Sequence, residues 1–260
     1  MQVFAERILE GKTALVTGGG SGIGAGIAQV LARQGARVAL AGRRADKLDE
    51  VAGRIRGEGG TALTLPGDVR DWGSVSGNVE RCVQELGSLD IVINGAAGNF
   101  PVPASQLSSN GFKAVMDIDL LGTFNVCRAA FEPLSRQGGA IVSITATQAF
   151  VPTMLQVHVG AAKAGIEKMT KDLALEWGPF GIRVNTIAPG PVEGTEGMSR
   201  LAPGEMATDL KKRMPLGRYA SIEEIAHGVL FLVSPAGSFI TGAMLLMDGG
   251  MSLVGSRLFD

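Results

Sequence analysis

Short runs of apolar and β-branched residues alternate with longer stretches of mixed polarity along almost the whole chain. Apolar residues recur at helical spacing in the longer stretches, whereas the short runs are mainly apolar or β-branched and do not alternate with polar residues. The short runs predict strands over 13–17, 37–41, 61–65, 90–93, 140–144, 182–187 and 243–247. The longer stretches predict helices ending near 33 and spanning about 45–56, 71–85, 110–134, 157–177 and 221–232.

Continuous apolar runs are typical of parallel strands whose two faces are both covered by helices. Strands that alternate with helices at this spacing predict βαβ units and an α/β fold, a doubly wound parallel sheet with helices on both faces. The chain has 260 residues and carries no internal repeat or linker. We therefore expect one domain over 1–260.

Residues 191–220 interrupt the alternation with a concentration of proline and glycine. A long irregular segment in an α/β domain commonly covers the substrate, so we expect a substrate lid over 191–220. A surface excursion without a function is the alternative.

Composition excludes several classes of protein. Lys and Arg number 24 and Asp and Glu 25, and the resulting net charge of -1 provides no field that would recruit nucleic acid. Hydrophobic residues make up 45% of the chain, which argues against disorder. The two cysteines, Cys82 and Cys127, indicate a reducing compartment. Neither they nor the two histidines have the spacing of a metal site.

The apolar runs are too short for a membrane span. The first residues do not resemble a signal or transit peptide, and the last residues, 257–260, do not form a Ser-Lys-Leu peroxisomal signal. These features predict a cytoplasmic protein.

A glycine-rich segment directly follows the first predicted strand and opens the first helix. Glycines at this point let the backbone approach a pyrophosphate, and the helix N-terminus offers it free N–H groups. The context predicts a Rossmann-type dinucleotide site. The predicted contacts are Gly18, Gly20, Ser21, Gly22, Ile23 and Gly24.

The end of the second strand indicates which nicotinamide cofactor binds. NAD-binding proteins usually carry a carboxylate there, whereas a 2′-phosphate is accommodated by arginine. This chain has Arg43 and Arg44 after Gly42, and its next acid is Asp46. Guanidinium groups bind phosphate with planar, paired contacts, so we expect NADP(H).

The chain resembles the short-chain dehydrogenases/reductases over nearly its whole length. The motifs are the glycine loop 17–24, Gly67-Asp68-Val69, the segment 94–97, the Pro-Gly turn of 185–190 and Asp248-Gly249-Gly250. The resemblance implies further cofactor contacts at Asp68, Val69, Asn94, Ala96, Lys163, Pro189, Gly190, Val192 and Thr195.

Three positions depart from the usual family pattern. Lys163 is present, but Val159 stands where the family has its catalytic Tyr, and Ala146 stands in place of Ser. Asp119 replaces the usual Asn. Hydride addition to a ketone produces an alkoxide that needs a positioned acid, commonly providing about 10²–10⁴-fold in rate. Ordinary ketone reduction is therefore not expected, unless Tyr219, the only tyrosine, reaches the site.

The same three departures resemble the peroxisomal-type 2,4-dienoyl-CoA reductase branch of the family. The mitochondrial type has a Tyr farther upstream, where this chain has Gln148. The resemblance implies NADPH-dependent reduction of 2,4-dienoyl-CoA to 3-enoyl-CoA in a homotetramer, with Asp119 and Lys163 as catalytic residues that hold a water. It also implies acyl-CoA contacts at Arg70, Phe100, Ser108, Ser109, Asn110 and Arg200.

The chemistry of dienoyl thioester reduction is compatible with the absence of the family's Tyr and Ser. Hydride addition to a conjugated thioester gives a delocalised anion that needs oxyanion stabilisation more than an immediate acid. Two alternatives stay open: a reductase of another conjugated acyl or cyclic thioester, and a non-catalytic protein that senses NADP or binds partners. His158, beside the Lys163 motif, and His227 are expected to be structural, with the imidazole of His158 hydrogen-bonded.

Overall fold

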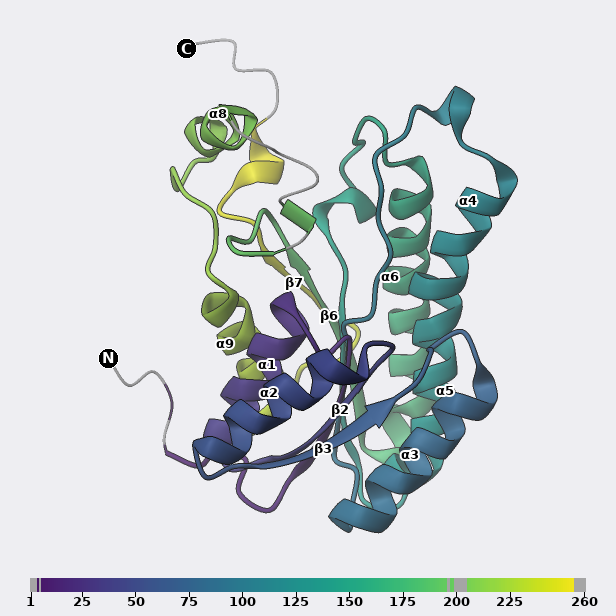
Figure 1. Ribbon diagram of the computed structural model, residues 1–260, viewed down its shortest axis with the longest axis vertical. Helices are drawn as coiled ribbons and strands as arrows, with labels where there is room; N and C mark the ends of the chain where they lie inside the picture. The colour runs from purple at the N-terminus through teal and green to yellow at the C-terminus, as the bar shows by residue number, and fades with distance from the viewer. Residues whose placement is uncertain (1–3, 5, 196, 199–204, 255–260) are drawn as a thin grey trace.

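The computed structural model describes residues 4, 6–195, 197–198 and 205–254 (Figure 1). The strands are β1 Thr13–Thr17, β2 Arg37–Gly42, β3 Thr61–Pro66, β4 Ile91–Asn94, β5 Gly139–Ile144, β6 Ile182–Pro189 and β7 Met244–Met247. The α-helices are α1 Gly22–Arg33, α2 Ala45–Gly57, α3 Trp72–Leu86, α4 Ser109–Val115, α5 Gly122–Ser135, α6 Val157–Trp177, α8 Glu205–Arg213 and α9 Ile222–Val233. The predicted strands and helices are confirmed, most of them to within two residues.

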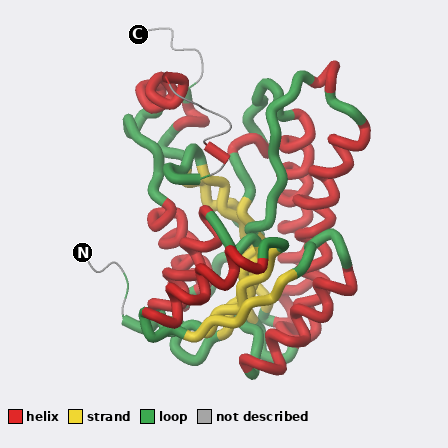
Figure 2. The backbone as a smooth tube through the Cα atoms, viewed as in Figure 1, coloured by secondary structure: helices red, strands yellow, loops and turns green. Residues whose placement is uncertain are grey.

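The seven strands form one sheet in the order β3-β2-β1-β4-β5-β6-β7, and every pair of neighbours is parallel. Helices α1, α2 and α9 cover one face, and α3, α5 and α6 cover the other (Figures 1 and 2). The strand interiors are buried on both sides, which explains their continuous apolar sequences. The predicted doubly wound fold is confirmed.

The order of the strands reverses between β1 and β4, and this switch opens a crevice at the carboxyl ends of the strands. Thr17 at the end of β1 is paired with Asn94 at the end of β4, and Asn94 is paired with Ser143 of β5. The loops after these strands therefore begin at the same edge of the sheet.

Two segments differ from the sequence-based prediction. The helix predicted over 110–134 is α4 and α5 joined by a π-helical segment, Met116–Leu121. A π-helical turn inserts one extra residue and changes which side chains face inward, an effect that the apolar spacing does not reveal. The segment 191–220 contains α8 and is closed at its base by a bridge between Val192 and Ala220. No described helix is long and apolar enough to cross a bilayer.

Candidate active site

The glycine loop between β1 and α1 packs too tightly for side chains. Gly18 has φ +67°, and a Cβ added to it would lie 2.5 Å from the carbonyl oxygen of Gly95. A Cβ on Gly24 would lie 2.3 Å from the carbonyl oxygen of Gly18. The loop is thus fixed between the end of β4 and the first turn of α1, whose N–H groups face the crevice.

A cavity of about 1140 Å³ extends from this loop to Lys163. A Cβ added to Gly22 would meet only the Cγ2 atom of Thr195, at 3.9 Å, so the loop and the segment after β6 form the two sides of a slot. The predicted cofactor residues that line the cavity are Gly18, Gly20, Ser21, Gly22, Ile23, Gly24, Arg43, Arg44, Asp68, Val69, Ala96, Lys163, Pro189, Gly190, Val192 and Thr195.

Asn94 is the exception among the predicted cofactor residues. It is buried behind the cavity, where its amide donates to Ser143 Oγ at 3.1 Å and to Cys127 Sγ at 3.3 Å. Its side chain fastens β4 to β5 and α5 and does not line the cavity. Its neighbours Gly95, Ala97 and Gly98 line the cavity, although none of them was among the predicted cofactor contacts.

Arginines define one end of the cavity. Arg44 donates to Ser21 Oγ at 3.0 Å, and Arg43 lines the same wall. Asp68 lies nearby and accepts hydrogen bonds from Arg70. This guanidinium lowers the pKa of the Asp68 carboxyl, and the charge of Arg43 acts in the same direction. The end of the cavity therefore combines two arginines with one ionised carboxylate.

The predicted acyl-CoA residues that belong to the described part of the chain do not line this cavity. Arg70 is bound to Asp68 at 2.6 Å, and Ser108 caps α4 by accepting from the Gly111 N–H. Phe100 packs on His158, with ring centroids 4.5 Å apart. Ser109 and Asn110 form the exposed first turn of α4. The remaining residue of that group, Arg200, lies outside the described residues.

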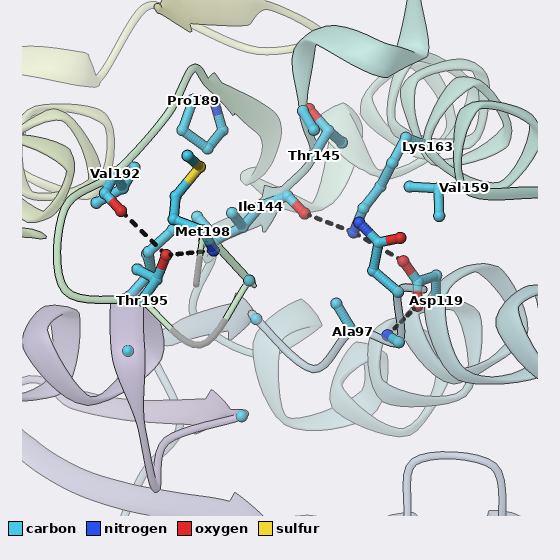
Figure 3. A pocket seen from close by; sticks show the side chains of 18 of the residues that line it. Ala97, Asp119, Ile144, Thr145, Val159, Lys163, Pro189, Val192, Thr195 and Met198 are labelled. Carbon is cyan, nitrogen blue, oxygen red and sulfur yellow. Dashed lines mark hydrogen bonds and ion pairs between the residues drawn. The ribbon is translucent and has the colours of Figure 1, made fainter. Parts of the chain in front are cut away.

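The opposite end of the cavity holds a buried ion pair (Figure 3). Lys163 Nζ lies 3.0 Å from Asp119 Oδ2, and the two side chains are 7% and 0% exposed. Lys163 also donates to the carbonyl oxygen of Ile144 at 3.2 Å. Asp119 Oδ1 accepts the Gly98 N–H at 2.7 Å. The pair thus joins the π-helical segment, α6 and the ends of β4 and β5.

The positions of the usual family acid are apolar in this structure. Val159 and Ala146 both line the cavity, and Figure 3 shows Val159 beside Lys163. Tyr219 is 7% exposed and does not line the cavity. Its ring lies under Lys211 Nζ, 4.8 Å from the ring centroid, and burial raises the pKa of its hydroxyl. Tyr219 is therefore not placed as the acid.

Sequence reasoning missed part of the lining. The segment between β5 and α6 contributes Thr147, Gln148, Met154, Leu155 and Gln156 to the cavity. The available signal was that this segment follows a strand that ends at the crevice. From the 191–220 segment, Met198, Asp209, Leu210 and Arg213 also line the cavity.

His158 is completely buried, and neither ring nitrogen has a hydrogen-bond partner among the described residues. The expectation of a hydrogen-bonded imidazole is therefore wrong, because the ring is held by packing on Phe100. His227 packs against Phe4, with ring centroids 5.9 Å apart. Within the described part of the chain, no group of three or more His, Cys, Asp or Glu residues is placed to hold a metal.

Known proteins match this chain almost throughout. A protein-family model described as Enoyl-(Acyl carrier protein) reductase matches residues 18–252. Peroxisomal 2,4-dienoyl-CoA reductase of Pongo abelii is 47% identical over 251 residues, covering 95% of this chain and 86% of the relative. A probable 2,4-dienoyl-CoA reductase of Bacillus subtilis, named as producing the (2E)-enoyl-CoA, is 41% identical over 249 residues, covering 94% and 98%.

Solved structures agree with this similarity. A citronellol catabolism dehydrogenase of Pseudomonas aeruginosa superposes with a TM-score of 0.86 at 36% identity, covering 96% of this chain and 99% of that one. A putative short-chain alcohol dehydrogenase of Sinorhizobium meliloti superposes with a TM-score of 0.90 at 32% identity, covering 95% of this chain and 98% of that one. Motifs, fold and relatives together show that this chain is an oxidoreductase and belongs to the short-chain dehydrogenase/reductase family.

Proposed function

We propose that this protein reduces 2,4-dienoyl-CoA to 3-enoyl-CoA with NADPH, an auxiliary step in the degradation of unsaturated fatty acids. The buried Asp119–Lys163 pair beside apolar Val159 and Ala146 carries the proposal. This arrangement has charged groups at the reacting end of the cavity but lacks the Tyr and Ser hydroxyls with which the family reduces ketones. The names of the relatives support the same substrate class.

The lining of the cavity fits NADPH. The N–H groups at the start of α1 suit the pyrophosphate, and Asp68 and Val69 suit the adenine. Arg43 and Arg44 suit the 2′-phosphate because they can make charge-assisted contacts from the end of β2. Lys163, Pro189, Gly190, Val192 and Thr195 would hold the nicotinamide half. Bound NADPH supplies a hydride at the end of the cavity near Lys163.

The electrons and atoms of the reaction balance. Hydride adds to C5 of the dienoyl thioester, and the electron pairs shift so that C3=C4 forms and the thioester oxygen becomes negative. The resulting dienolate then takes one proton at C2, giving the 3-enoyl thioester. Dienoyl-CoA, NADPH and one proton are consumed, and 3-enoyl-CoA and NADP⁺ are formed.

Asp119 and Lys163 would hold the water that delivers the proton. Asp119 is fixed by Gly98 and by Lys163, so its carboxylate has a defined orientation. A carboxylate accepts one hydrogen of a water, and the ammonium group polarises the water oxygen. Because the two groups are in direct contact, the proton relay belongs to the pair.

The acyl-CoA and the lid belong to the same proposal. Eight residues of the 191–220 segment line the cavity, which supports its role as a lid over the substrate. Coenzyme A would extend from the cavity over the exposed surface, where its phosphates suit arginine. We propose contacts there at Arg70, Phe100, Ser108, Ser109, Asn110 and Arg200.

Exposed apolar side chains favour an assembly of several copies. Leu175 and Phe239 are 81% and 102% exposed, and Met244 and Leu246 are exposed on the edge strand β7. Large exposed apolar patches commonly mark protein interfaces. We propose the homotetramer of the family, which mass measurement in solution tests. We also propose a cytoplasmic location, which cell fractionation separates from the peroxisomal location that several relatives' names give.

NADPH absorbance with purified protein and 2,4-hexadienoyl- or 2,4-decadienoyl-CoA tests the reaction, with NADH and an acetoacetyl thioester as controls. We expect NADPH oxidation with the dienoyl thioesters only. In D₂O, the product should carry deuterium at C2 of a 3-enoyl chain. A 2-enoyl product labelled at C4 would show a different site of protonation, and oxidation with another conjugated thioester alone would favour that reductase class. Tight NADPH binding without any turnover would favour a sensing protein.

A further inference from the structure

One face of α6 presents three residues to the cavity. Gln156, at the N-cap, Val159 and Lys163 are spaced i, i+3 and i+7, and all three line the cavity. Residues at this spacing lie along one side of a helix, and seven residues span about 10 Å along its axis. Val159 occupies the position of the family's acid. Gln156 is therefore the next polar side chain on this face toward the N-terminus of α6.

Gln156 is buried without a structural task of its own. It is 4% exposed, and its Oε1 atom has no hydrogen-bond partner among the described residues. It occupies the N-cap position, but its side chain makes no capping hydrogen bond. Buried polar side chains normally have partners because an unpaired one costs free energy. The amide is thus oriented into the cavity and available to a ligand.

A second amide lies on the neighbouring wall. Asn99 lines the cavity, and its Oδ1 atom is buried without a partner in the described structure. It directly follows Gly98, whose N–H holds Asp119. The Val102 N–H donates to the Leu155 carbonyl oxygen at 3.1 Å, so this loop runs beside the segment that ends at Gln156. Two unsatisfied amides therefore flank the reacting end of the cavity.

The proposed reaction needs a hydrogen-bond donor for the thioester oxygen, and the two positions of the family's usual acid do not provide one. Negative charge develops on the thioester oxygen, and preorganised donors stabilise such charge strongly. Val159 and Ala146 have no donor side chain. Lys163 Nζ is already paired with Asp119 and donates to the Ile144 carbonyl oxygen, and it would also hold the water and the ribose. Gln156 provides an uncharged donor that does not titrate.

We propose that the Gln156 side-chain amide donates a hydrogen bond from Nε2 to the thioester carbonyl oxygen and is a catalytic residue. This inference rests on the function proposed above. The amide stabilises the dienolate without protonating it, so oxyanion binding and proton delivery are divided between Gln156 and the Asp119–Lys163 pair.

Replacing Gln156 by Met keeps the length of the side chain and removes the donor. We expect kcat to fall by about 10²-fold, the magnitude found when one oxyanion donor is lost, with little change in NADPH affinity. Gln156→Glu should lose at least as much, because a carboxylate accepts and repels the developing charge. Gln148→Met is the matched control. It lies in the same cavity, where its Oε1 lies 3.5 Å from Thr147 Oγ1, and it should lose far less activity.

A spectroscopic readout separates substrate contact from a structural effect. The absorption of a conjugated thioester moves to longer wavelength when its carbonyl oxygen accepts a hydrogen bond. With NADP⁺ and 2,4-hexadienoyl-CoA, the unmodified protein and Gln148→Met should show this shift, and a folded Gln156→Met variant should bind the substrate without it. Unchanged kcat and an unchanged shift in Gln156→Met would overturn the inference. Absence of turnover in the unmodified protein would instead overturn the proposed function.

Discussion

Lys163 Nζ lies 3.0 Å from Asp119 Oδ2, and both groups are enclosed where the family normally places an uncharged Asn near its lysine. Asp119 comes from the π-helical segment and Lys163 from the second turn of α6. Because neither side chain is exposed to bulk water, removing one partner leaves the other charge buried and uncompensated. Catalysis and stability therefore depend on the same contact.

Asp119→Asn should remove most of the activity while preserving the fold. The variant retains an oxygen that can accept the Gly98 N–H, but it loses the charge that orients the water. We expect a fall in kcat of about 10²–10⁴-fold, the usual contribution of a general acid or base. Steady-state NADPH oxidation measures the fall in kcat, and NADPH binding shows whether the fold is preserved. Full activity in Asp119→Asn would contradict the proposed proton relay.

Lys163→Met should be inactive and destabilised by about 3–5 kcal/mol, because Asp119 would be left buried without its partner. The matched control is Lys168→Met on the same helix, since Lys168 forms an exposed pair with Asp172 at 2.5 Å. Loss of that surface pair should cost less than about 1 kcal/mol and leave activity unchanged. Urea unfolding compares the two variants. Equal free energies of unfolding for the two variants would contradict the predicted contribution of the buried Asp119–Lys163 pair to stability.

Arg43→Ala and Arg44→Ala should weaken the binding of NADPH but not that of NADH. A charge-assisted hydrogen bond contributes about 1.5–3 kcal/mol, so each variant should raise the Kd for NADPH by about tenfold or more. The Kd for NADH should change little, because that cofactor has no 2′-phosphate. Titration with both cofactors measures the ratio. An equal loss for NADH and NADPH would indicate that the arginines only support the loop.

Tyr219→Phe should retain the activity of the unmodified protein. The hydroxyl belongs to a ring buried beneath Lys211, outside the cavity lining. The variant keeps the ring and removes only the proton donor. A large loss of kcat with an unchanged melting temperature would mean that Tyr219 reaches the substrate during turnover, contrary to the tyrosine-free mechanism.

The fold was predictable because the sequence pattern of each strand agrees with its burial in the sheet. The strands of a doubly wound sheet are buried on both faces, so 13–17 and 91–94 are visible as mainly apolar and β-branched runs without alternation. The glycine loop was predictable for a similar reason: the close approach of Gly18 to Gly95 tolerates no side chain. The π-helical turn left no such signal, since it changes the phase of a helix by a single residue.

The site was only partly predictable from sequence. Positions 119, 146 and 159 stand out because the family pattern assigns them a chemistry that this chain lacks. Asn94 belongs to a motif at the right place, but its side chain points to Ser143 and not into the cavity, a direction that the motif does not specify. The availability of Gln156 is visible only in three dimensions, because a buried amide without a partner has no sequence signature.

Glu224 should contribute stability that depends on pH. Arg218 donates two hydrogen bonds to it at 2.7 and 2.8 Å, and the Ser221 N–H donates a third, in a capping box at the start of α9. These contacts, chiefly Arg218, lower the pKa of Glu224 from an ordinary 4.5 to about 2. A carboxyl whose folded pKa is lowered stabilises the fold above its unfolded pKa, and that stability is lost as the pH falls from about 4.5 toward 2.

The measurement compares unfolding of the unmodified protein and Glu224→Gln between pH 7 and pH 2. The side chain is 42% exposed, so solvent screening limits the difference at pH 7 to about 1 kcal/mol. The difference should shrink below pH 4.5 and be mostly lost at pH 2, where about half of the Glu224 carboxyl is protonated in the folded protein. Glu223→Gln is the control, because its nearest ion pair, with Arg33, is 3.7 Å long. If the difference in free energy of unfolding between the unmodified protein and Glu224→Gln stayed constant over this range, the charge of Glu224 would not contribute to stability.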